Sequence, residues 1–254
     1  MHNFFVEPCQ IHKEEIEILG MDVSHIRQVL KMRAKEQIMV RDGYGHNYLC
    51  EITELLEDRV LVKILESREV KAELPSEVWL FQCLPKGDKM ELIIQKAVEL
   101  GAVRIVPVSS ARCVVKLDAK RESNKRKRWN LIAESAAKQS GRGIIPEVMP
   151  VQGFAEALSM AGKLDVRLIP YECAEELLTE VHKTPMQQTK EAIGRIQRGQ
   201  SVGVFIGPEG GLEKAEVEAA IQAGAVPITL GKRILRTETA GLSILSVLMF
   251  HLEE

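Results

Sequence analysis

The sequence predicts an α/β protein that consists of a small, mostly β module at residues 1–72 and a larger domain at residues 73–254. Two observations lead to this prediction. From Glu77 onward, apolar segments of strand length alternate with helical segments, which is typical of a parallel sheet covered by helices. Before residue 72, short apolar segments follow one another with turn residues between them. A chain of 254 residues is long enough for two such domains.

Short strands and one helix are expected in the N-terminal module. The segments QIMVRD, NYLCEI and RVLVKIL have strand-like patterns, and Asp42-Gly43-Tyr44-Gly45 provides a turn between the first two. Before them, apolar residues at helical spacing predict a helix at residues 23–32, with Arg27, Lys31 and Arg33 nearby. The charged stretch SREVKAELPSE that follows the strands is interpreted as a linker.

Strands joined by helices are expected in the larger domain. The strand segments are EVWLFQC, VRIVPV, VRLIP, VGVFIG and VPITLG, and helices are expected at residues 88–100, 118–140, 211–223 and 239–252. Asp88 is a suitable N-cap for the first of these helices, and Gly101 follows its end. Because helices separate the strands, the sheet should be parallel.

Composition excludes several classes of protein. Hydrophobic residues make up 45% of the chain and charged residues 28%, which is ordinary for a globular protein. The five cysteines lie far apart, so neither a disulfide framework nor a metal site is expected. The segment MHNFFVEPCQ does not resemble a signal peptide, and the longest apolar stretch, at residues 239–250, is shorter than the roughly 20 residues that span a bilayer. We expect a soluble cytoplasmic protein without membrane contact.

The distribution of charge is uneven although the net charge is only −2. Ten basic and three acidic residues lie between Arg112 and Arg142, most of them in the helix expected at 118–140. Such a segment is either a solvated helix face or a site for a polyanion such as nucleic acid, and charge alone does not separate the two interpretations.

Three strand ends are candidates for a ligand site, because open α/β sheets bind ligands at the carboxyl ends of their strands. They are residues 168–172, 205–211 and 230–240. The second contains three glycines and a proline before a helix, and is either a tight turn or a loop whose amides face a ligand. Neither a dinucleotide fingerprint nor a Walker loop is present. The third places arginines, threonines and a glutamate before an apolar helix, either as a polar site or as a helix cap.

The segments IGPEGGLEKAEVEAA and LGKRILRTETA together resemble the diagnostic motifs of the RsmE family, methyltransferases of 16S ribosomal RNA in the SPOUT superfamily. The resemblance covers essentially the whole chain. It includes FFV, HIRQVLKM, the DGYG turn, KGDKMELIIQKAVELG, ARC and KRWNLIAESAAKQSGR followed by IP. Several motifs in one order are more specific than a single glycine loop.

The resemblance implies a fold, a cofactor and a reaction. Relatives have an N-terminal PUA-like β-barrel and a C-terminal α/β domain with a trefoil knot, and they act as homodimers on 16S rRNA or the small ribosomal subunit. They bind S-adenosylmethionine through the knot loops and methylate N3 of a uridine in the decoding region. Carried over to this chain, the cofactor-binding residues are Tyr171, Glu172, Ile206, Gly207, Pro208, Glu209, Gly210, Leu230, Gly231, Arg233, Ile234, Leu235, Thr239 and Ala240.

Methylation at N3 of uracil requires loss of the imide proton and stabilisation of the resulting anion. An arginine can stabilise that charge and a carboxylate can accept the proton, so Arg236 and Glu238 are the catalytic candidates. No metal is needed. The expected RNA-binding residues are Arg27, Lys31, Arg33, Arg112, Lys125, Arg126, Arg128 and Arg142.

Two other functions remain open from the residues alone. A nucleotide-binding enzyme with an unusual glycine loop would bind ATP or NAD, and a non-catalytic RNA-binding protein would bind no cofactor. The last helix is apolar nearly all round, which indicates either a dimer contact that includes Leu245 and Leu248 or complete burial within one chain.

Overall fold

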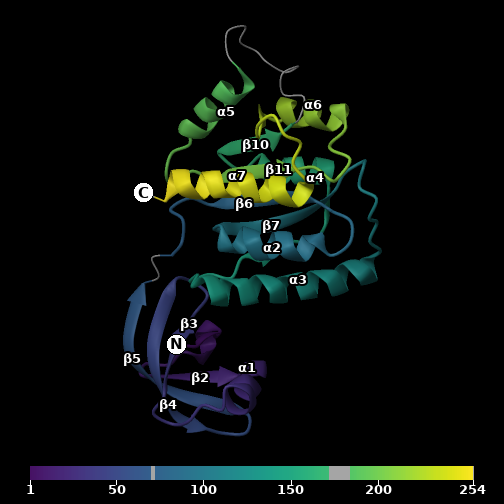
Figure 1. The fold of residues 1–254 in the computed structure, drawn as a ribbon. Coiled ribbons are helices and arrows are strands. Elements are labelled where there is room, and N and C mark those ends of the chain that lie inside the picture. Colours follow the sequence, from purple (N-terminus) through teal and green to yellow (C-terminus); the bar gives the residue numbers. More distant parts are fainter. Residues whose placement is uncertain (70–71, 172–183, 254) are drawn as a thin grey trace. The chain divides into compact units, whose positions relative to one another are not determined.

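A computed structural model describes residues 1–69, 72–171 and 184–253 of the chain (Figure 1). The chain forms two compact units. The first comprises Met1–Glu73 together with Ala137–Ile145, and the second comprises Leu74–Ala136 together with Pro146–Glu254. The segment 137–145, which includes the end of the long basic helix, is thus part of the first unit. The domain limits expected from the sequence, at 1–72 and 73–254, stay a prediction.

The first unit is built on a curled five-stranded sheet in the order β1-β3-β4-β5-β2. Its strands are β1 (Asn3–Phe5), β2 (Glu15–Leu19), β3 (Gln37–Arg41), β4 (His46–Leu55) and β5 (Arg59–Glu69). All neighbours are antiparallel except β1 and β3. Alternate residues of the strands point inward, and a buried cluster of aliphatic side chains with Phe4 and Cys50 forms the core. The segment read as a linker begins inside β5.

The helix expected at 23–32 begins and ends earlier in the chain, and its second part is a π-type turn, which is wider than an α-helical turn. A short α1 (Met21–Ser24) continues into one π-type turn, η2 (His25–Val29). Lys31 then adopts a positive φ of 52°, and the amide of Met32 donates to the carbonyl oxygen of Ile26 at 3.0 Å. This left-handed residue ends the helix, as glycine does in many helix C-termini.

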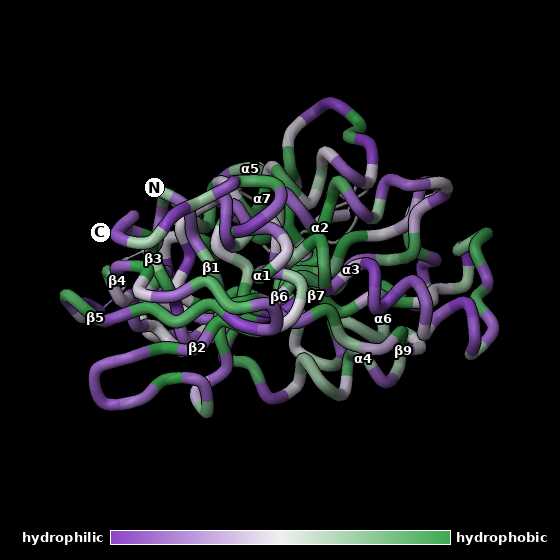
Figure 2. Tube along the Cα trace, turned by 90° about the horizontal axis from the view of Figure 1, so that it is seen from below, coloured by the Kyte–Doolittle hydropathy of each residue, from purple (hydrophilic) through white to green (hydrophobic). Residues whose placement is uncertain are grey.

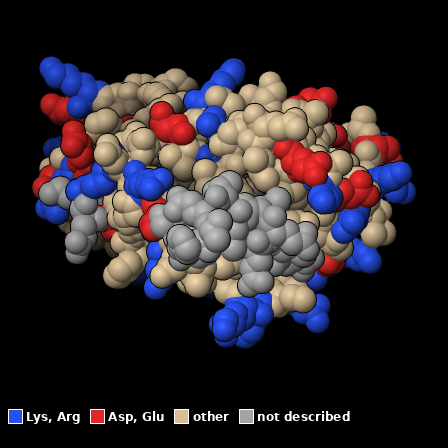
Figure 3. Space-filling view, turned by 90° about the horizontal axis from the view of Figure 1, so that it is seen from above, with Lys and Arg blue, Asp and Glu red and all other residues tan. Residues whose placement is uncertain are grey.

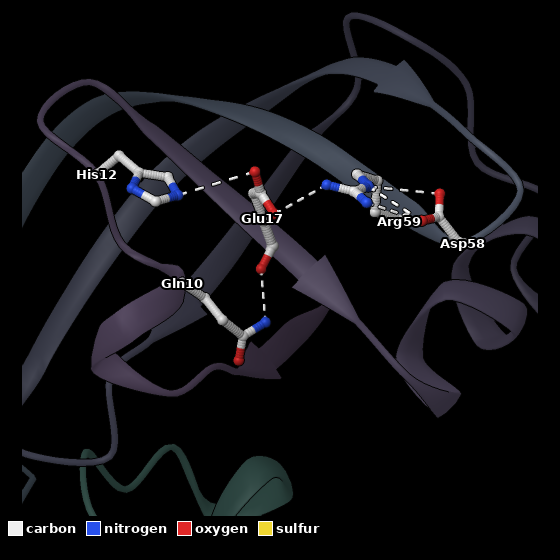
Figure 4. Close-up of polar contacts among 5 residues, drawn as sticks. All are labelled: Gln10, His12, Glu17, Asp58 and Arg59. Carbon is white, nitrogen blue, oxygen red and sulfur yellow. Dashed lines mark hydrogen bonds and ion pairs between the residues drawn. The ribbon is translucent and has the colours of Figure 1, made fainter.

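A surface cluster of polar side chains fastens the short 3-10 helix η1 (Pro8–Gln10) to the sheet (Figure 4). The side-chain amide of Gln10 donates to the carbonyl oxygen of Glu17 at 2.6 Å. The Glu17 carboxylate lies 3.3 Å from Arg59 and 3.8 Å from His12, while Arg59 also pairs with Asp58 at 2.8 Å. Because these groups are accessible to water, their main effect is on local geometry rather than stability.

A buried network holds segment 137–145 in the first unit. The Arg142 guanidinium is 2% exposed and donates to the carboxylate of Glu73, with Nε 3.1 Å from Oε2. The amides of Gly143 and Ile144 also donate to Glu73. Buried Arg41 donates in turn to the carbonyl oxygen of Arg142 at 3.1 Å. Burial lowers the pKa of Arg41, and the Glu73 charge opposes that shift.

The second unit contains a parallel sheet in the order β12-β10-β11-β6-β7-β8, as predicted from the alternation of strands and helices. Its strands are β6 (Val78–Cys83), β7 (Ala102–Ser109), β8 (Glu147–Val148), β10 (Val166–Pro170), β11 (Val202–Ile206) and β12 (Val226–Ile228), and β9 (Gln152–Gly153) pairs with β7. Most apolar side chains of β6 and β7 are buried, and hydrophobic stretches of the chain lie around the β7 label in Figure 2. Phe81 and Phe205 stack at 4.4 Å across β6 and β11.

Helices cover this sheet, and two of them matter most for the site. The helices are α2 (Lys89–Glu99), α3 (Ala119–Ser140), α4 (Phe154–Ala161), α5 (Pro185–Gly194), α6 (Lys214–Gln222) and α7 (Thr237–Leu252). Helices α2 and α7 pack side by side (Figure 1). Helix α6 begins later than expected, because Gly211 has a positive φ of 69° and Glu213 forms a capping box with Glu216. No helix of the described residues is long and apolar enough to cross a membrane.

Candidate functional site

The glycine-rich loop at residues 207–211 leaves the carboxyl end of β11 and leads to α6. The amide of Gly211 donates to the carbonyl oxygen of Pro208 at 2.9 Å, which closes a tight turn. A Cβ atom on Gly207 would lie 3.2 Å from the backbone nitrogen of Leu212, so the loop folds back on itself and leaves no room for a side chain there. A Cβ atom on Gly210 would meet only the Arg112 side chain, at 3.7 Å.

A buried polar chain ties this loop to the start of α7. The hydroxyl of Thr237 donates to the carbonyl oxygen of Gly207 at 2.7 Å, and the side-chain amide of Gln82 donates to the Thr237 hydroxyl at 2.9 Å. Gln82 is fully buried at the end of β6, directly opposite Ile206 in the sheet register. Gln82 and Thr237 are not among the residues predicted to form the site. A glutamine in the otherwise apolar strand EVWLFQC is the signal that indicates such a role, because buried polar groups need partners.

An ionic contact joins the same two segments closer to solvent. The ammonium nitrogen of Lys89, at the start of α2, lies 3.1 Å from the carboxylate of Glu209 and 3.2 Å from that of Glu238. The amide of Lys86 donates to the same Glu209 oxygen at 3.0 Å. The glycine loop, α2 and α7 therefore meet at a single lysine, which is also absent from the predicted site residues.

These contacts shift the pKa values of all three charged groups. Hydrogen bonds to Glu209 and then Glu238 raise the pKa of Lys89. Partial burial acts to raise the pKa of Glu209, but hydrogen bonds from the amide of Lys86 and from Lys89 outweigh it, so the pKa is lowered. A hydrogen bond to its own backbone amide and the nearby Lys89 and Arg236 lower the pKa of Glu238. At neutral pH both carboxylates are charged and engaged.

The loop after β12, at residues 229–236, presents a charged and apolar surface. Gly231 has a φ of 110°, and its amide donates to the hydroxyl of Thr229 at 3.2 Å. Arg233 and Arg236 are exposed, and the side chain of Ile234 is 85% exposed. Of the other predicted cofactor residues here, Leu230, Gly231, Leu235 and Ala240 are half-buried and Thr239 is exposed.

The first of the three predicted strand ends, residues 168–172, is described except for its last residue. The amide of Tyr171 donates to the carbonyl oxygen of Ile228 at 3.0 Å, which continues the pairing of β10 with β12. Glu172 lies outside the described residues. Tyr171, Ile206 and Leu230 therefore follow or end strands at one edge of the sheet, as expected for parallel strands.

The two catalytic candidates lie at the head of α7 in different settings. Arg236 is the N-cap residue and is exposed. Glu238 is held by Lys89 and has a lowered pKa, which makes it a weak proton acceptor. The catalytic roles of Arg236 and Glu238 stay predictions.

Several of the basic residues expected to bind RNA have partners within the second unit. The Nε of Arg126 donates to the carbonyl oxygen of Val148 at 3.1 Å, and Arg128 pairs with Glu91 at 2.7 Å. Lys125 lies over the Trp129 ring at 5.9 Å. Exposed Lys120 and Lys127 extend from the same helix. On the face shown in Figure 3, basic and acidic side chains are mixed rather than gathered by sign.

Arg142 must be removed from the expected RNA contacts. Its guanidinium is buried and bonded to Glu73, and exposing it to a phosphate would break that pair. In the first unit, Arg27, Lys31 and Arg33 are exposed, although Arg27 also donates to the carbonyl oxygen of Glu57 at 3.2 Å.

Arg112 belongs to a turn that contacts the glycine loop. Its guanidinium donates to the carbonyl oxygen of Gly210 at 3.0 Å. The neighbouring Cys113 thiol lies 3.2 Å from the hydroxyl of Ser110. A hydrogen bond from buried Cys83 lowers the pKa of Cys113 to about 6. The ARC segment thus supports the loop from the side of β7.

The dimer contact expected at Leu245 and Leu248 is wrong in its choice of residues. Both side chains are at most 1% exposed within one chain, where α7 packs against α2 and β11. The apolar residues of α7 that face outward are Val247, 46% exposed, and Phe250, 84% exposed.

Comparison with known proteins identifies both parts of the chain. Residues 72–249 match a family described as RNA methyltransferase domain, and residues 20–65 match one described as RNA methyltransferase PUA domain. Ribosomal RNA small subunit methyltransferase E of Bacillus subtilis is 37% identical over 256 residues, which cover 100% of this chain and 98% of that protein.

Two solved structures of relatives contain S-adenosylmethionine. Ribosomal RNA small subunit methyltransferase E from Neisseria gonorrhoeae is 32% identical with a TM-score of 0.81, and the alignment covers 98% of this chain and 97% of that chain. A putative methyltransferase from Legionella pneumophila is 30% identical with a TM-score of 0.82, covering 97% and 96%.

A PUA domain followed by an α/β domain with a parallel sheet and a glycine loop at its carboxyl edge defines an RNA methyltransferase of the SPOUT type. Within that class, the chain belongs to the ribosomal RNA small subunit methyltransferase E family.

Proposed function

We propose that this protein transfers a methyl group from S-adenosylmethionine to N3 of a uridine in the decoding region of 16S ribosomal RNA, in the cytoplasm. Family membership and the cofactor in two relatives support the proposal. The observation that carries it in this chain is the junction of the glycine loop with α7 through Gln82, Thr237 and the Gly207 carbonyl. The trefoil knot of the family is part of the same proposal.

The residues at this junction fit the cofactor. The loop is a tight turn at the carboxyl end of β11, closed by the hydrogen bond from the amide of Gly211 to the carbonyl oxygen of Pro208, which suits a ligand held by main-chain amides and carbonyls. The cofactor, when bound, supplies the methyl group from its sulfonium. We propose that the loops at 206–210 and 230–240, the second of which includes Arg233 and Ile234, hold it together with Tyr171 and Glu172.

Residues of the chain have separate tasks in the proposed reaction. Arg236 is exposed at the head of α7 and can stabilise negative charge that develops on the uracil carbonyl oxygens when the N3 proton leaves. Glu238, held by Lys89, sets the position of that helix start rather than accepting the proton. A water molecule is then the acceptor we favour. Because N3 lies on the Watson–Crick edge, the target uridine must be unpaired or splayed out.

Titration calorimetry tests the cofactor, and mass spectrometry tests the reaction. The protein should bind S-adenosylmethionine but not ATP or NAD. Incubation with the cofactor and unmodified small subunits should add one methyl group to a uridine of 16S rRNA, and repeating the reaction with free rRNA identifies the form that is the substrate. ATP binding without S-adenosylmethionine binding would favour a nucleotide-dependent enzyme, and binding of RNA alone would favour a non-catalytic protein.

The basic residues that we propose for RNA contact are Arg27, Lys31, Arg33, Arg112 and five residues of α3. In α3, Lys120, Lys127 and Arg128 are exposed, and Lys125 and Arg126 are half-buried. Changing Lys120 and Lys127 to glutamate should weaken RNA binding without loss of cofactor affinity. The slope of log affinity against log salt concentration should fall by about 0.7–0.9 for each phosphate contact that is lost. Lys163→Glu, at an exposed lysine outside α3, is the matched control. An unchanged slope would mean that this face of α3 is only solvated.

A homodimer through α7 is also part of the proposal. Val247 and Phe250 lie three residues apart on the same face of the helix and are exposed, so a second copy of the chain can cover them. Phe250→Asp should shift the sedimentation of the protein from dimer to monomer while the unfolding temperature of the monomer stays near that of the unaltered chain, because the substituted side chain is outside the core. A Phe250→Asp variant that sediments as a dimer, with the same dissociation constant as the unaltered protein, would show that the interface lies elsewhere.

A further inference from the structure

Lys89 occupies a position that the proposed reaction does not yet explain. Its ammonium group lies between two carboxylates from segments far apart in sequence, Glu209 of the glycine loop at 3.1 Å and Glu238 of α7 at 3.2 Å. The side chains of all three residues are less than one-third exposed. Without the lysine, two carboxylates of like charge would face each other, and the segments that carry them would be pushed apart.

The ionic contact is the second of two ties between the same segments. The first is the buried hydroxyl of Thr237, which fixes the carbonyl oxygen of Gly207. Thr237 and Glu238 are consecutive in the chain. The start of α7 is therefore joined to the loop by a hydrogen bond between neutral groups at Thr237 and by the ionic contact through Lys89 at Glu238. The amide of Lys86 donates to Glu209 as well, so the segment before α2 also holds the side chain of Glu209 in the loop.

We propose that Lys89 is a positioning residue of the methyltransferase site, which holds the glycine loop and the head of α7 at the separation that cofactor binding and methyl transfer require. The inference rests on the proposed function, because it takes the glycine loop as the cofactor site. It also bears on Arg236, whose charge acts on Glu238. When Lys89 is absent, Arg236 is the cation left to pair with Glu238, and that pairing withdraws the guanidinium from the substrate.

Lys89→Met tests the inference by its effect on two separate quantities. The dissociation constant for S-adenosylmethionine, measured by calorimetry, should rise about tenfold because the loop loses its outer tie. The kcat at saturating cofactor should also fall, because Arg236 is drawn to Glu238. Lys89→Arg should restore most of both. In Lys89→Met/Glu238→Gln, removal of one repelling carboxylate should recover part of the cofactor affinity, which a general loss of folding would not produce.

Lys96→Met is the matched control, because Lys96 lies on the same helix and pairs with Glu99 instead of the loop. Cofactor affinity and kcat of Lys89→Met within twofold of the unaltered protein would overturn the inference and leave the proposed function intact. So would failure of both Lys89→Arg and the double variant to recover affinity. Absence of S-adenosylmethionine binding by the unaltered protein would instead overturn both proposals.

Discussion

Replacement of Arg142 by methionine is expected to lower the free energy of unfolding of the N-terminal unit by about 3–5 kcal/mol, the range found when one partner of a buried ion pair is removed. Arg142 is 2% exposed, and its loss would leave the Glu73 carboxylate without its main counter-charge. Methionine has a similar length but cannot donate a hydrogen bond. The amides of Gly143 and Ile144 would still donate to Glu73, so segment 137–145 should loosen rather than detach at once.

Hydrogen–deuterium exchange measures this effect where it occurs. The amides of residues 143 and 144 should exchange much faster in Arg142→Met, and the first thermal transition should move to a lower temperature. Arg128→Met provides the comparison, because the pair of Arg128 with Glu91 lies at the surface and its loss should cost no more than about 1 kcal/mol. Equal protection of these amides in Arg142→Met and the unaltered protein would contradict the structural role assigned to Arg142.

The difference between Arg142 and Arg128 shows what a sequence pattern can and cannot predict. Both belong to one basic segment, and the helix predicted at 118–140 correctly covers most of it. Whether a given arginine faces water depends on a partner elsewhere in the chain, here Glu73, which is 69 residues away from Arg142. Local charge counts contain no information about such distant partners.

The prediction of the site has the same strength and the same gap: local pattern locates the segments, but the contacts between distant segments are missed. Strand ends and glycines correctly predict the loop at 207–211 and the start of α7 as neighbours at one edge of the sheet, because the carboxyl ends of parallel strands meet there. The contacts that join them come from Gln82, Lys89 and Thr237, of which the first two belong to segments that pattern alone marks as an ordinary strand and helix. Their roles depend on the strand order, which places β6 next to β11.

Gly207→Ala is expected to weaken S-adenosylmethionine binding about 100-fold, which corresponds to about 2.7 kcal/mol. The added Cβ would lie 3.2 Å from the backbone nitrogen of Leu212 and 3.3 Å from the carbonyl carbon of Gly211. Side chains can rotate away from such a contact, but these atoms belong to a turn closed by the hydrogen bond from Gly211 to Pro208. The loop must therefore shift, and with it the Gly207 carbonyl that Thr237 holds.

Gly210→Ala separates this effect from a general intolerance of side chains in the loop. Its Cβ would meet only the flexible side chain of Arg112, at 3.7 Å, and its backbone has no positive φ, so the loop can keep its shape. Calorimetry on both variants should show a large loss of cofactor affinity for Gly207→Ala and a change of no more than a few-fold for Gly210→Ala, with circular dichroism spectra like that of the unaltered protein. Because the rest of the sheet is untouched in both, a folded Gly207→Ala variant with normal affinity would show that the cofactor does not depend on the shape of this turn.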